Sequence, residues 1–255
     1  QDADDICHAL RFAEREKLPV VIIGGGNNFL VKDCGVRGVV LKLQGCMSRI
    51  EFRGEEAVVG AGASLSGVIR EAAAFDLGGL ESLVGIPATI GGALAMNAGG
   101  EDGVIDDSVS AIYFGRPNGT LGDFKANGGG CVFHAPPGAV IVGCRLRFRR
   151  RPRAEIQKDI KERLKRKGAK DPLALASARC WKNPPGDVAG RLVEKVGLKG
   201  KRFSEAEISA KHPNFIVNRG EATAADILAL MEMTQERVLA QFGVKLEPEI
   251  RIIGE

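Results

Sequence analysis

The chain has 255 residues, of which 44% are hydrophobic and 27% charged, and its formal net charge is +4. This composition is typical of a globular protein and excludes a disordered tail, a collagen-like repeat and a small disulfide scaffold. The longest apolar runs, such as residues 18–23, are far shorter than the roughly 20 residues of a membrane-spanning helix, and the opening residues do not resemble a signal peptide, so we predict a cytoplasmic protein with no membrane partner.

The first 150 residues carry one helical pattern followed by short strands. Residues 4–16 have apolar side chains at helical spacing, including Ile6, Leu10 and Ala13, which predicts an amphipathic helix. A second such helix is expected at residues 65–75, with Ser64 as its N-cap. Short apolar runs separated by Gly, Asp or Ser predict strands at residues 18–23, 29–32, 38–43, 49–53, 57–60 and 139–147.

The pattern changes near residue 150, where Arg151-Pro152-Arg153 is followed by a strongly charged segment. Helices are expected at residues 154–167, 188–196 and 223–242, and a strand at residues 246–253. We therefore predict an α+β protein with a strand-rich first domain, residues 1–150, and a smaller mixed domain, residues 151–255.

Several partner classes are disfavoured by residue usage. Tyr113 and Trp181 are the only residues of their kinds, so no aromatic platform for nucleic-acid bases is expected. The basic excess at residues 147–170 fits a solvated helix or the binding of an acidic ligand nearby. The six cysteines lack the C-x-x-C spacing of a zinc site and predict reduced thiols and no metal; they are Cys7, Cys34, Cys46, Cys131, Cys144 and Cys180.

Two glycine-rich segments stand out in the first domain. The sequence GGGNNFLV, residues 24–31, follows a predicted buried strand, so its backbone N–H groups could surround a pyrophosphate. A tight turn between two strands explains these glycines equally well. The second segment, GIPATIGGALAMNAGG at residues 85–100, indicates close packing by a bulky planar group or by another backbone, and a close helix packing contact is the plain alternative. Two such segments in one domain favour an extended cofactor with phosphates in its middle.

Together with KNPPGDVAGRLVEKVGLKG, KHPNFIVN and VKLEPEIRIIG further along, these segments resemble the UDP-N-acetylenolpyruvoylglucosamine reductase family over nearly the whole chain. The resemblance implies an FAD-binding domain of the vanillyl-alcohol-oxidase type followed by an α+β substrate-binding domain. It also implies an oxidoreductase of peptidoglycan precursor synthesis that uses NADPH and FAD to convert UDP-N-acetylglucosamine enolpyruvate to UDP-N-acetylmuramate. The enzyme must therefore hold a flavin and a charged nucleotide sugar, and supply one proton.

The resemblance also assigns residues to these roles. Glu249 matches the family's acidic residue near the reacting carbons, where a carboxylate could orient or stabilise the intermediate or relay a proton; an exposed glutamate at a strand end is the plain alternative. Lys182 and Asn183 match the loop that lines the substrate, and the basic residues of 161–170 suit the diphosphate. The flavin-contacting segments comprise Gly24, Gly25, Gly26, Asn27, Asn28, Leu30, Ala88, Thr89, Gly91, Gly92, Asn97, Ala98 and Gly99.

The sequence departs from the family pattern at the proton donor. The family has a serine four residues before the asparagine, and here that position holds Arg179, whose guanidinium does not release a proton. If the loop is one residue shorter than usual, Cys180 takes the donor position, and a thiol with an ordinary pKa of about 8.5 is mostly protonated at neutral pH. We therefore predict Cys180 as the proton donor. The alternatives are a packed thiol at Cys180, with Ser177 as the hydroxyl donor.

Two further departures leave alternatives open. The family's Tyr-Arg pair is absent from residues 127–133, and family members have several dozen residues before the equivalent of Gln1, so the chain is expected to be part of a longer protein. A non-catalytic flavin or nucleotide-sugar binding protein and a related FAD oxidoreductase with another substrate are the competing functions.

Overall fold

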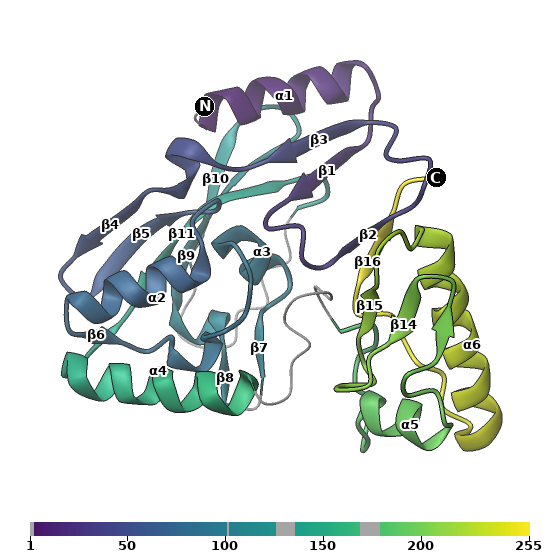
Figure 1. Ribbon diagram of the computed structural model, residues 1–255. Helices are drawn as coiled ribbons and strands as arrows, with labels where there is room; N and C mark the ends of the chain where they lie inside the picture. Colours follow the sequence, from purple (N-terminus) through teal and green to yellow (C-terminus); the bar gives the residue numbers. More distant parts are fainter. Residues whose placement is uncertain (1–2, 101, 126–135, 169–178) are drawn as a thin grey trace. The chain divides into compact units, whose positions relative to one another are not determined.

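The computed structural model describes residues 3–100, 102–125, 136–168 and 179–255 (Figure 1). Contacts between residues divide the chain into two compact units. Unit 1 comprises Gln1–Gly26 and Gly38–Arg166, and unit 2 comprises Asn27–Arg37 and Lys167–Glu255. The chain therefore enters unit 2 briefly before it completes unit 1.

Unit 1 is built on an antiparallel sheet of five strands in the order β10-β9-β11-β5-β4. Strand β11 (Val140–Arg147) lies at its centre and pairs with both β9 and β5. Four residues of β11, namely Val140, Val142, Cys144 and Leu146, alternate along the strand and are buried in the core, as expected for a strand with one covered face. The other strands are β4 (Ile50–Arg53), β5 (Glu56–Gly60), β9 (Val109–Gly115) and β10 (Leu121–Lys125).

Helices cover this sheet, and short strands lie at its margins (Figure 1). Helix α1 (Ala3–Arg15) packs against β9 and β3 (Val39–Lys42), and β3 pairs in parallel with β1 (Val20–Ile23). The side chain of Ser64 accepts a hydrogen bond from the Gly67 amide at 3.1 Å and starts α2 (Leu65–Ala74), as predicted. The remaining elements are α3 (Ile90–Ala95), β6 (Leu77–Gly78), β7 (Gly99–Gly100), β8 (Gly103–Val104), β12 (Arg149–Arg150) and 3-10 helices at Gly45–Ser48, Glu81–Leu83 and Ile105–Ser108.

The charged helix α4 (Arg153–Gly168) belongs largely to unit 1, which differs from the predicted division at residue 150. Ile156 of α4 is 1% exposed, and it lines a small cavity together with Ile69 and Ala72 of α2. Arg151 ties α4 to the rest of unit 1, with 3.0 Å ion pairs to Glu81 of the 3-10 helix Glu81–Leu83 and to Asp159 of α4. These contacts explain why the boundary lies after residue 166.

Unit 2 consists of a small sheet, two helices and a parallel strand pair. Strands β13 (Arg202–Phe203), β14 (Ala206–Ile208) and β15 (Ile216–Asn218) are antiparallel, with β14 in the middle. Helix α6 (Ala224–Phe242) begins with a capping box between Thr223 and Asp226 and ends at Gly243, whose φ of 67° is in the left-handed region. Helix α5 (Ala189–Lys195) and the parallel pair β2 (Phe29–Val31) and β16 (Arg251–Ile253) complete the unit.

The fold agrees with most predicted elements and differs at the short ones. Helix α3 lies inside the glycine-rich segment 85–100, where the pattern predicted none, and the final strand is limited to Arg251–Ile253. In the described part of the chain, no helix is both long enough and apolar enough to cross a membrane.

Candidate functional site

The first glycine-rich segment directly follows β1 and touches the second one. A Cβ atom on Gly24 would lie 2.4 Å from the Oγ1 of Thr89, a distance too short for any real side-chain contact. Gly26 has a φ of 77°, which favours glycine because L side chains are strained there. The structure therefore brings the two predicted cofactor segments together within unit 1.

Thr89 organises the second segment at the start of the short helix α3. Its hydroxyl accepts a hydrogen bond from the Gly92 amide at 3.3 Å, and the Ala88 carbonyl accepts one from the Leu65 amide at 2.9 Å. The Gly91 amide donates to the Ala61 carbonyl at 2.8 Å, and a Cβ on Gly91 would meet the Ala61 Cβ at 2.9 Å. Close backbone packing thus explains Gly91, as the alternative interpretation expected.

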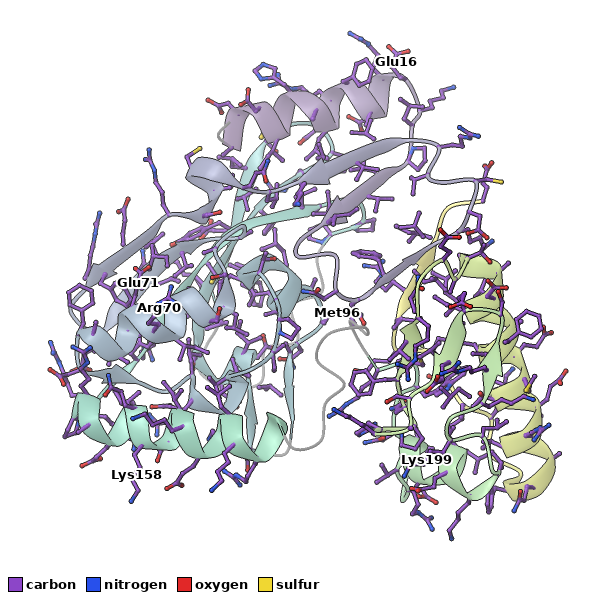
Figure 2. All side chains as sticks on the ribbon, viewed as in Figure 1. Glu16, Arg70, Glu71, Met96, Lys158 and Lys199 are labelled. Atoms are coloured by element: carbon purple, nitrogen blue, oxygen red, sulfur yellow. The ribbon has the colours of Figure 1, made fainter. Side chains whose placement is uncertain are left out.

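The end of the same segment is also shaped by internal contacts. Asn97 has a φ of 43°, and its side-chain oxygen accepts a hydrogen bond from the Asp106 amide at 3.4 Å. A Cβ on Gly99 would lie 2.3 Å from the Gly103 carbonyl oxygen, and the Ala98 amide donates to the Ala93 carbonyl. Met96, which is 43% exposed, lies just after α3 (Figure 2).

The residues present fit an extended, anionic cofactor. Gly25 and Gly26 are exposed, and their amide groups donate no hydrogen bond to the described residues of the chain. Free N–H groups in a glycine turn are the groups that bind phosphate oxygens. Unit 1 therefore offers donors at one segment and small residues, Ala88 and Gly92, at its neighbour.

Three of the predicted cofactor residues, Asn27, Asn28 and Leu30, lie in unit 2 instead. Leu30 pairs with Ile252 in the parallel ladder of β2 and β16. The Asn28 side-chain amide donates to the backbone carbonyl of Glu249 at 3.2 Å. The division between the units thus falls within the predicted pyrophosphate loop, after Gly26.

Glu249 is held in unit 2 by a short antiparallel ladder that joins two of the sequence motifs. Trp181 and Pro248 form an isolated bridge, and the Glu249 amide donates to the Cys180 carbonyl at 2.8 Å. Residues that face each other in this way lie on the same side of the ladder, so the side chains of Cys180 and Glu249 are cross-strand neighbours. Glu249 is half-buried, which makes it more than an exposed strand-end residue.

The electrostatic surroundings of Glu249 are mixed. Burial raises the pKa of the Glu249 carboxyl above its ordinary value, and the charges of Arg179 and Lys182 act in the opposite direction. Desolvation has the larger effect, so the carboxyl holds its proton to a higher pH than an exposed glutamate does. A carboxyl with a raised pKa that also feels the charges of two cations is suited to proton transfer next to an anionic ligand.

Cys180 lies in the core rather than at an exposed position. It is 4% exposed and shares the apolar core of unit 2 with Trp181 and Leu246. Burial raises the pKa of the Cys180 thiol to about 12, and the Glu249 charge contributes to the increase. The burial favours the packed-thiol alternative, whereas the position beside Glu249 is compatible with proton donation. Ser177 lies outside the described residues.

The two predicted substrate residues, Lys182 and Asn183, come directly after Trp181 in the chain. Lys182 is exposed, and its ammonium group pairs with Glu247 at 3.3 Å. The side-chain oxygen of Asn183 accepts a hydrogen bond from the Ala189 amide at 3.1 Å, at the start of α5, so part of this side chain is used to fix the loop. Both residues lie on the same loop as Cys180 and reach solvent.

Two further predictions concern the basic residues of α4 and the stretch in which the family has its Tyr-Arg pair. On α4, Lys158, Lys161, Lys165 and Arg166 are exposed, as expected of a solvated face, and Lys158 points away from the body of unit 1 (Figure 2). The stretch 127–133, where the Tyr-Arg pair is expected, lies outside the described residues. Among the residues that are described, no group of three or more His, Cys, Asp or Glu side chains could hold a metal ion.

Sequence reasoning missed Asn214, which supports the Cys180 loop. Asn214 is 2% exposed, and its side chain makes two hydrogen bonds with the backbone of Trp181, at 2.9 and 2.8 Å. The motif KHPNFIVN contains this residue, and an asparagine between a proline and an apolar run was the available signal.

Comparisons with known proteins agree with this arrangement. A family model described as FAD binding domain matches residues 1–124, and one described as UDP-N-acetylenolpyruvoylglucosamine reductase, C-terminal domain, matches residues 171–253. The chain is 39% identical to UDP-N-acetylenolpyruvoylglucosamine reductase 2 of Symbiobacterium thermophilum, over 99% of this chain and 84% of that protein. It is 41% identical to the reductase of Anaeromyxobacter dehalogenans strain 2CP-1, over 100% of this chain and 78% of that protein.

A solved structure gives the same result. The reductase from Thermus caldophilus matches 95% of this chain and 88% of its own length, with a TM-score of 0.83 and 36% sequence identity. The expected order of an FAD-binding domain and a smaller α+β domain is therefore confirmed. Because its relatives match along the whole sequence, the chain belongs to the UDP-N-acetylenolpyruvoylglucosamine reductase family, the FAD-containing, NADPH-dependent oxidoreductases of peptidoglycan precursor synthesis.

Proposed function

We propose that this chain reduces UDP-N-acetylglucosamine enolpyruvate to UDP-N-acetylmuramate with two separate groups of residues. The glycine-rich segments of unit 1 bind FAD, and the loop and ladder around Glu249 in unit 2 bind and protonate the substrate. The observation that carries this assignment is the Glu249 carboxyl, which is half-buried beside Arg179 and Lys182. Family membership supports the choice of substrate.

FAD binding rests on the backbone of unit 1. When bound, FAD accepts a hydride from NADPH and supplies one to the enolpyruvyl double bond. The exposed amides of Gly25 and Gly26 are suited to bind its pyrophosphate, and the absence of a side chain on Gly24 leaves room for Thr89. Ala88, Gly92, Asn97, Ala98 and Gly99 are proposed to line the cofactor with small side chains.

Glu249 is proposed to supply the proton. Reduction of a carbon–carbon double bond adds a hydride to one carbon and a proton to the other, so a group that holds a proton near neutral pH is required. Burial raises the pKa of Glu249 and so increases its protonated fraction. Lys182, together with Arg179, is suited to hold the anionic carboxylate or diphosphate of the substrate, and Asn183 can donate from its amide.

Cys180 is the second candidate for the proton donor. Its side chain neighbours Glu249 across the ladder, and a thiol with a pKa of about 12 keeps its proton at every physiological pH. Such a weak acid is a poorer match to the reaction than Glu249, because general acids work best with a pKa near the working pH.

The direct test is the visible spectrum of the purified protein before and after addition of NADPH, followed by the enolpyruvyl sugar without oxygen. We expect flavin absorption bands that bleach with NADPH and return with the sugar. Bleached flavin that the sugar does not reoxidise would favour another acceptor, and a protein that binds added FAD yet is not reduced by NADPH would favour the non-catalytic alternative.

The domain roles and the location are proposed on the same basis. Residues 1–150 hold the FAD site and residues 151–255 the sugar site, with the segment 27–37 added to the second unit and most of α4 to the first. A cytoplasmic location agrees with the five described cysteines, all of which are free thiols.

A further inference from the structure

The segment 27–37 follows the glycine turn of unit 1 in the chain and belongs to unit 2, where it forms one strand of the parallel pair. Its strand β2 pairs with β16, and the Lys32 and Cys34 amides extend the pairing to the carbonyls of Ile253 and Glu255, at 2.8 and 3.0 Å. The carboxylate of Asp33 accepts hydrogen bonds from the Ala224 and Ala225 amides, at 2.8 and 3.1 Å, and so caps α6. The segment is therefore firmly fixed within unit 2.

At the beginning of this segment, Asn28 makes two contacts with the backbone around Glu249. Its side-chain amide donates to the Glu249 carbonyl at 3.2 Å, and its own backbone carbonyl accepts from the Arg251 amide at 2.9 Å. On the other side, the Glu249 amide donates to the Cys180 carbonyl at 2.8 Å. Both the N–H and the C=O groups of Glu249 are thus occupied, one by the substrate loop and the other by Asn28.

We propose that Asn28 is a positioning residue for Glu249, in addition to any contact that it makes with the cofactor. The inference rests on the proposed role of Glu249 as proton donor. Hydrogen bonds to both peptide groups fix the backbone of Glu249, and the backbone sets the direction in which its side chain leaves. A carboxyl displaced by about 1 Å loses much of its effectiveness in proton transfer, so the amide of Asn28 contributes to the rate without touching the reacting atoms.

The location of Asn28 gives this role a structural consequence. Gly24 is packed against Thr89 in unit 1, and only residues 25–27 separate it from Asn28, which is bonded to Glu249 in unit 2. One five-residue stretch therefore carries both the proposed phosphate donors and the support of the acid.

The variant Asn28→Asp tests the proposal, because it keeps the size of the side chain and replaces the donor with an oxygen that repels the Glu249 carbonyl. In the FAD-loaded protein we expect reoxidation by the enolpyruvyl sugar to slow by about 10-fold to 100-fold. At saturating FAD, reduction by NADPH should slow much less than reoxidation, whatever the variant does to FAD affinity, because Asn28 also belongs to the predicted flavin segment. In a Glu249→Gln background, Asn28→Asp should slow reoxidation by less than about twofold, because coupled residues are not additive.

Asn218→Asp is the matched control, since the Asn218 amide donates in the same way to a backbone carbonyl of unit 2, that of Ala222 at 3.3 Å. It should leave reoxidation within about twofold of the parent. Equal slowing of both half-reactions in the FAD-loaded protein, or full additivity with Glu249→Gln, would overturn the proposal and make Asn28 a cofactor residue only. If Asn28→Asp does not fold, Asn28→Ser is measured in the same cycle. Failure of the parent protein to be reoxidised by the sugar would instead contradict the proposed function.

Discussion

The two units build their candidate binding regions from different kinds of contact. In unit 1 the contacts come from backbone and from missing side chains: Gly24 and Gly91 have no room for a Cβ, and Gly25 and Gly26 present amide groups. In unit 2 the contacts come from ionisable side chains on a short ladder, with Glu249 beside Arg179 and Lys182. The first arrangement is sensitive to added atoms, and the second to altered charge and proton affinity.

This contrast has a physical origin in the ligands that each unit is proposed to hold. A flavin nucleotide is large and already carries the reactive ring, so the protein must mainly provide space and donors for its phosphates. The enolpyruvyl group must receive a proton at one carbon, which requires a side chain with a suitable pKa. Changes in unit 1 should therefore affect cofactor occupancy, whereas changes in unit 2 should affect a single half-reaction.

The largest effect is expected from Glu249→Gln, which keeps the shape of the side chain and removes its acidic proton. Reoxidation of the reduced flavin by the enolpyruvyl sugar should slow by about 100-fold or more, the usual contribution of a general acid. Flavin content and reduction by NADPH should be unchanged. Stopped-flow absorbance of the two half-reactions measures both rates.

Glu247→Gln is the control for this variant, because Glu247 lies two residues away on the same ladder, is exposed and pairs with Lys182. It should change reoxidation by much less than Glu249→Gln.

Since the pKa of Glu249 is raised, the parent rate should fall as the pH rises through that pKa and the carboxyl loses its proton. A decline of the same shape in Glu249→Gln would assign the proton to another group.

An intermediate effect is expected from Gly24→Ala in unit 1. The new Cβ would lie 2.4 Å from the Thr89 hydroxyl, so the glycine turn must move away from the second segment. We expect the dissociation constant for FAD to rise by about 10-fold or more, equivalent to about 1.4 kcal/mol. Flavin fluorescence on titration measures this constant.

A second substitution, at Thr89, tests whether the clash with its hydroxyl causes the loss of FAD affinity in Gly24→Ala. Thr89→Ala removes the clashing hydroxyl, so the double variant should recover part of the FAD affinity that Gly24→Ala loses. Gly220→Ala is a suitable control, because among the described residues only the Glu205 carboxylate lies within 4 Å of its added Cβ, at 3.7 Å. Unchanged FAD affinity in Gly24→Ala would show that this contact does not shape the cofactor site.

The smallest effect on the reaction is expected from Cys180→Ala. The thiol is buried in the core, so its removal should lower the free energy of unfolding by about 1–2 kcal/mol. Reoxidation should slow by less than about 10-fold if Glu249 supplies the proton. Chemical denaturation and the same stopped-flow experiment measure the two quantities, and a 100-fold slower reoxidation would make Cys180 the donor.

Much of the fold follows from local patterns in the sequence. Helix α6 has a capping box at Thr223, an apolar face and a left-handed glycine at its end, and each of these signals is local. Helix α3 was not predicted, because two of its six residues are glycines, which disfavour helices in isolation. It forms where the Thr89 cap and the packing of Gly91 on Ala61 compensate.

The site was predictable in its residue types but not in its grouping. The motifs identified Gly24, Thr89 and Glu249, and the structure brings Gly24 and Thr89 together. The passage of residues 27–37 into unit 2 was not visible, since it depends on the pairing of β2 with β16 across more than 200 residues of sequence. Asn28 was therefore assigned to the flavin loop alone. Long-range strand pairing leaves no local signal from which its partner can be identified.

The lone tryptophan makes the two units separately observable. Trp181 is 2% exposed in the core of unit 2, and the chain has no other tryptophan, so the fluorescence of the protein without flavin reports the packing of that unit. Bound flavin would be a natural chromophore for unit 1. Each unit thus has its own optical signal, and the order in which the two signals are lost on heating distinguishes stepwise from concerted unfolding.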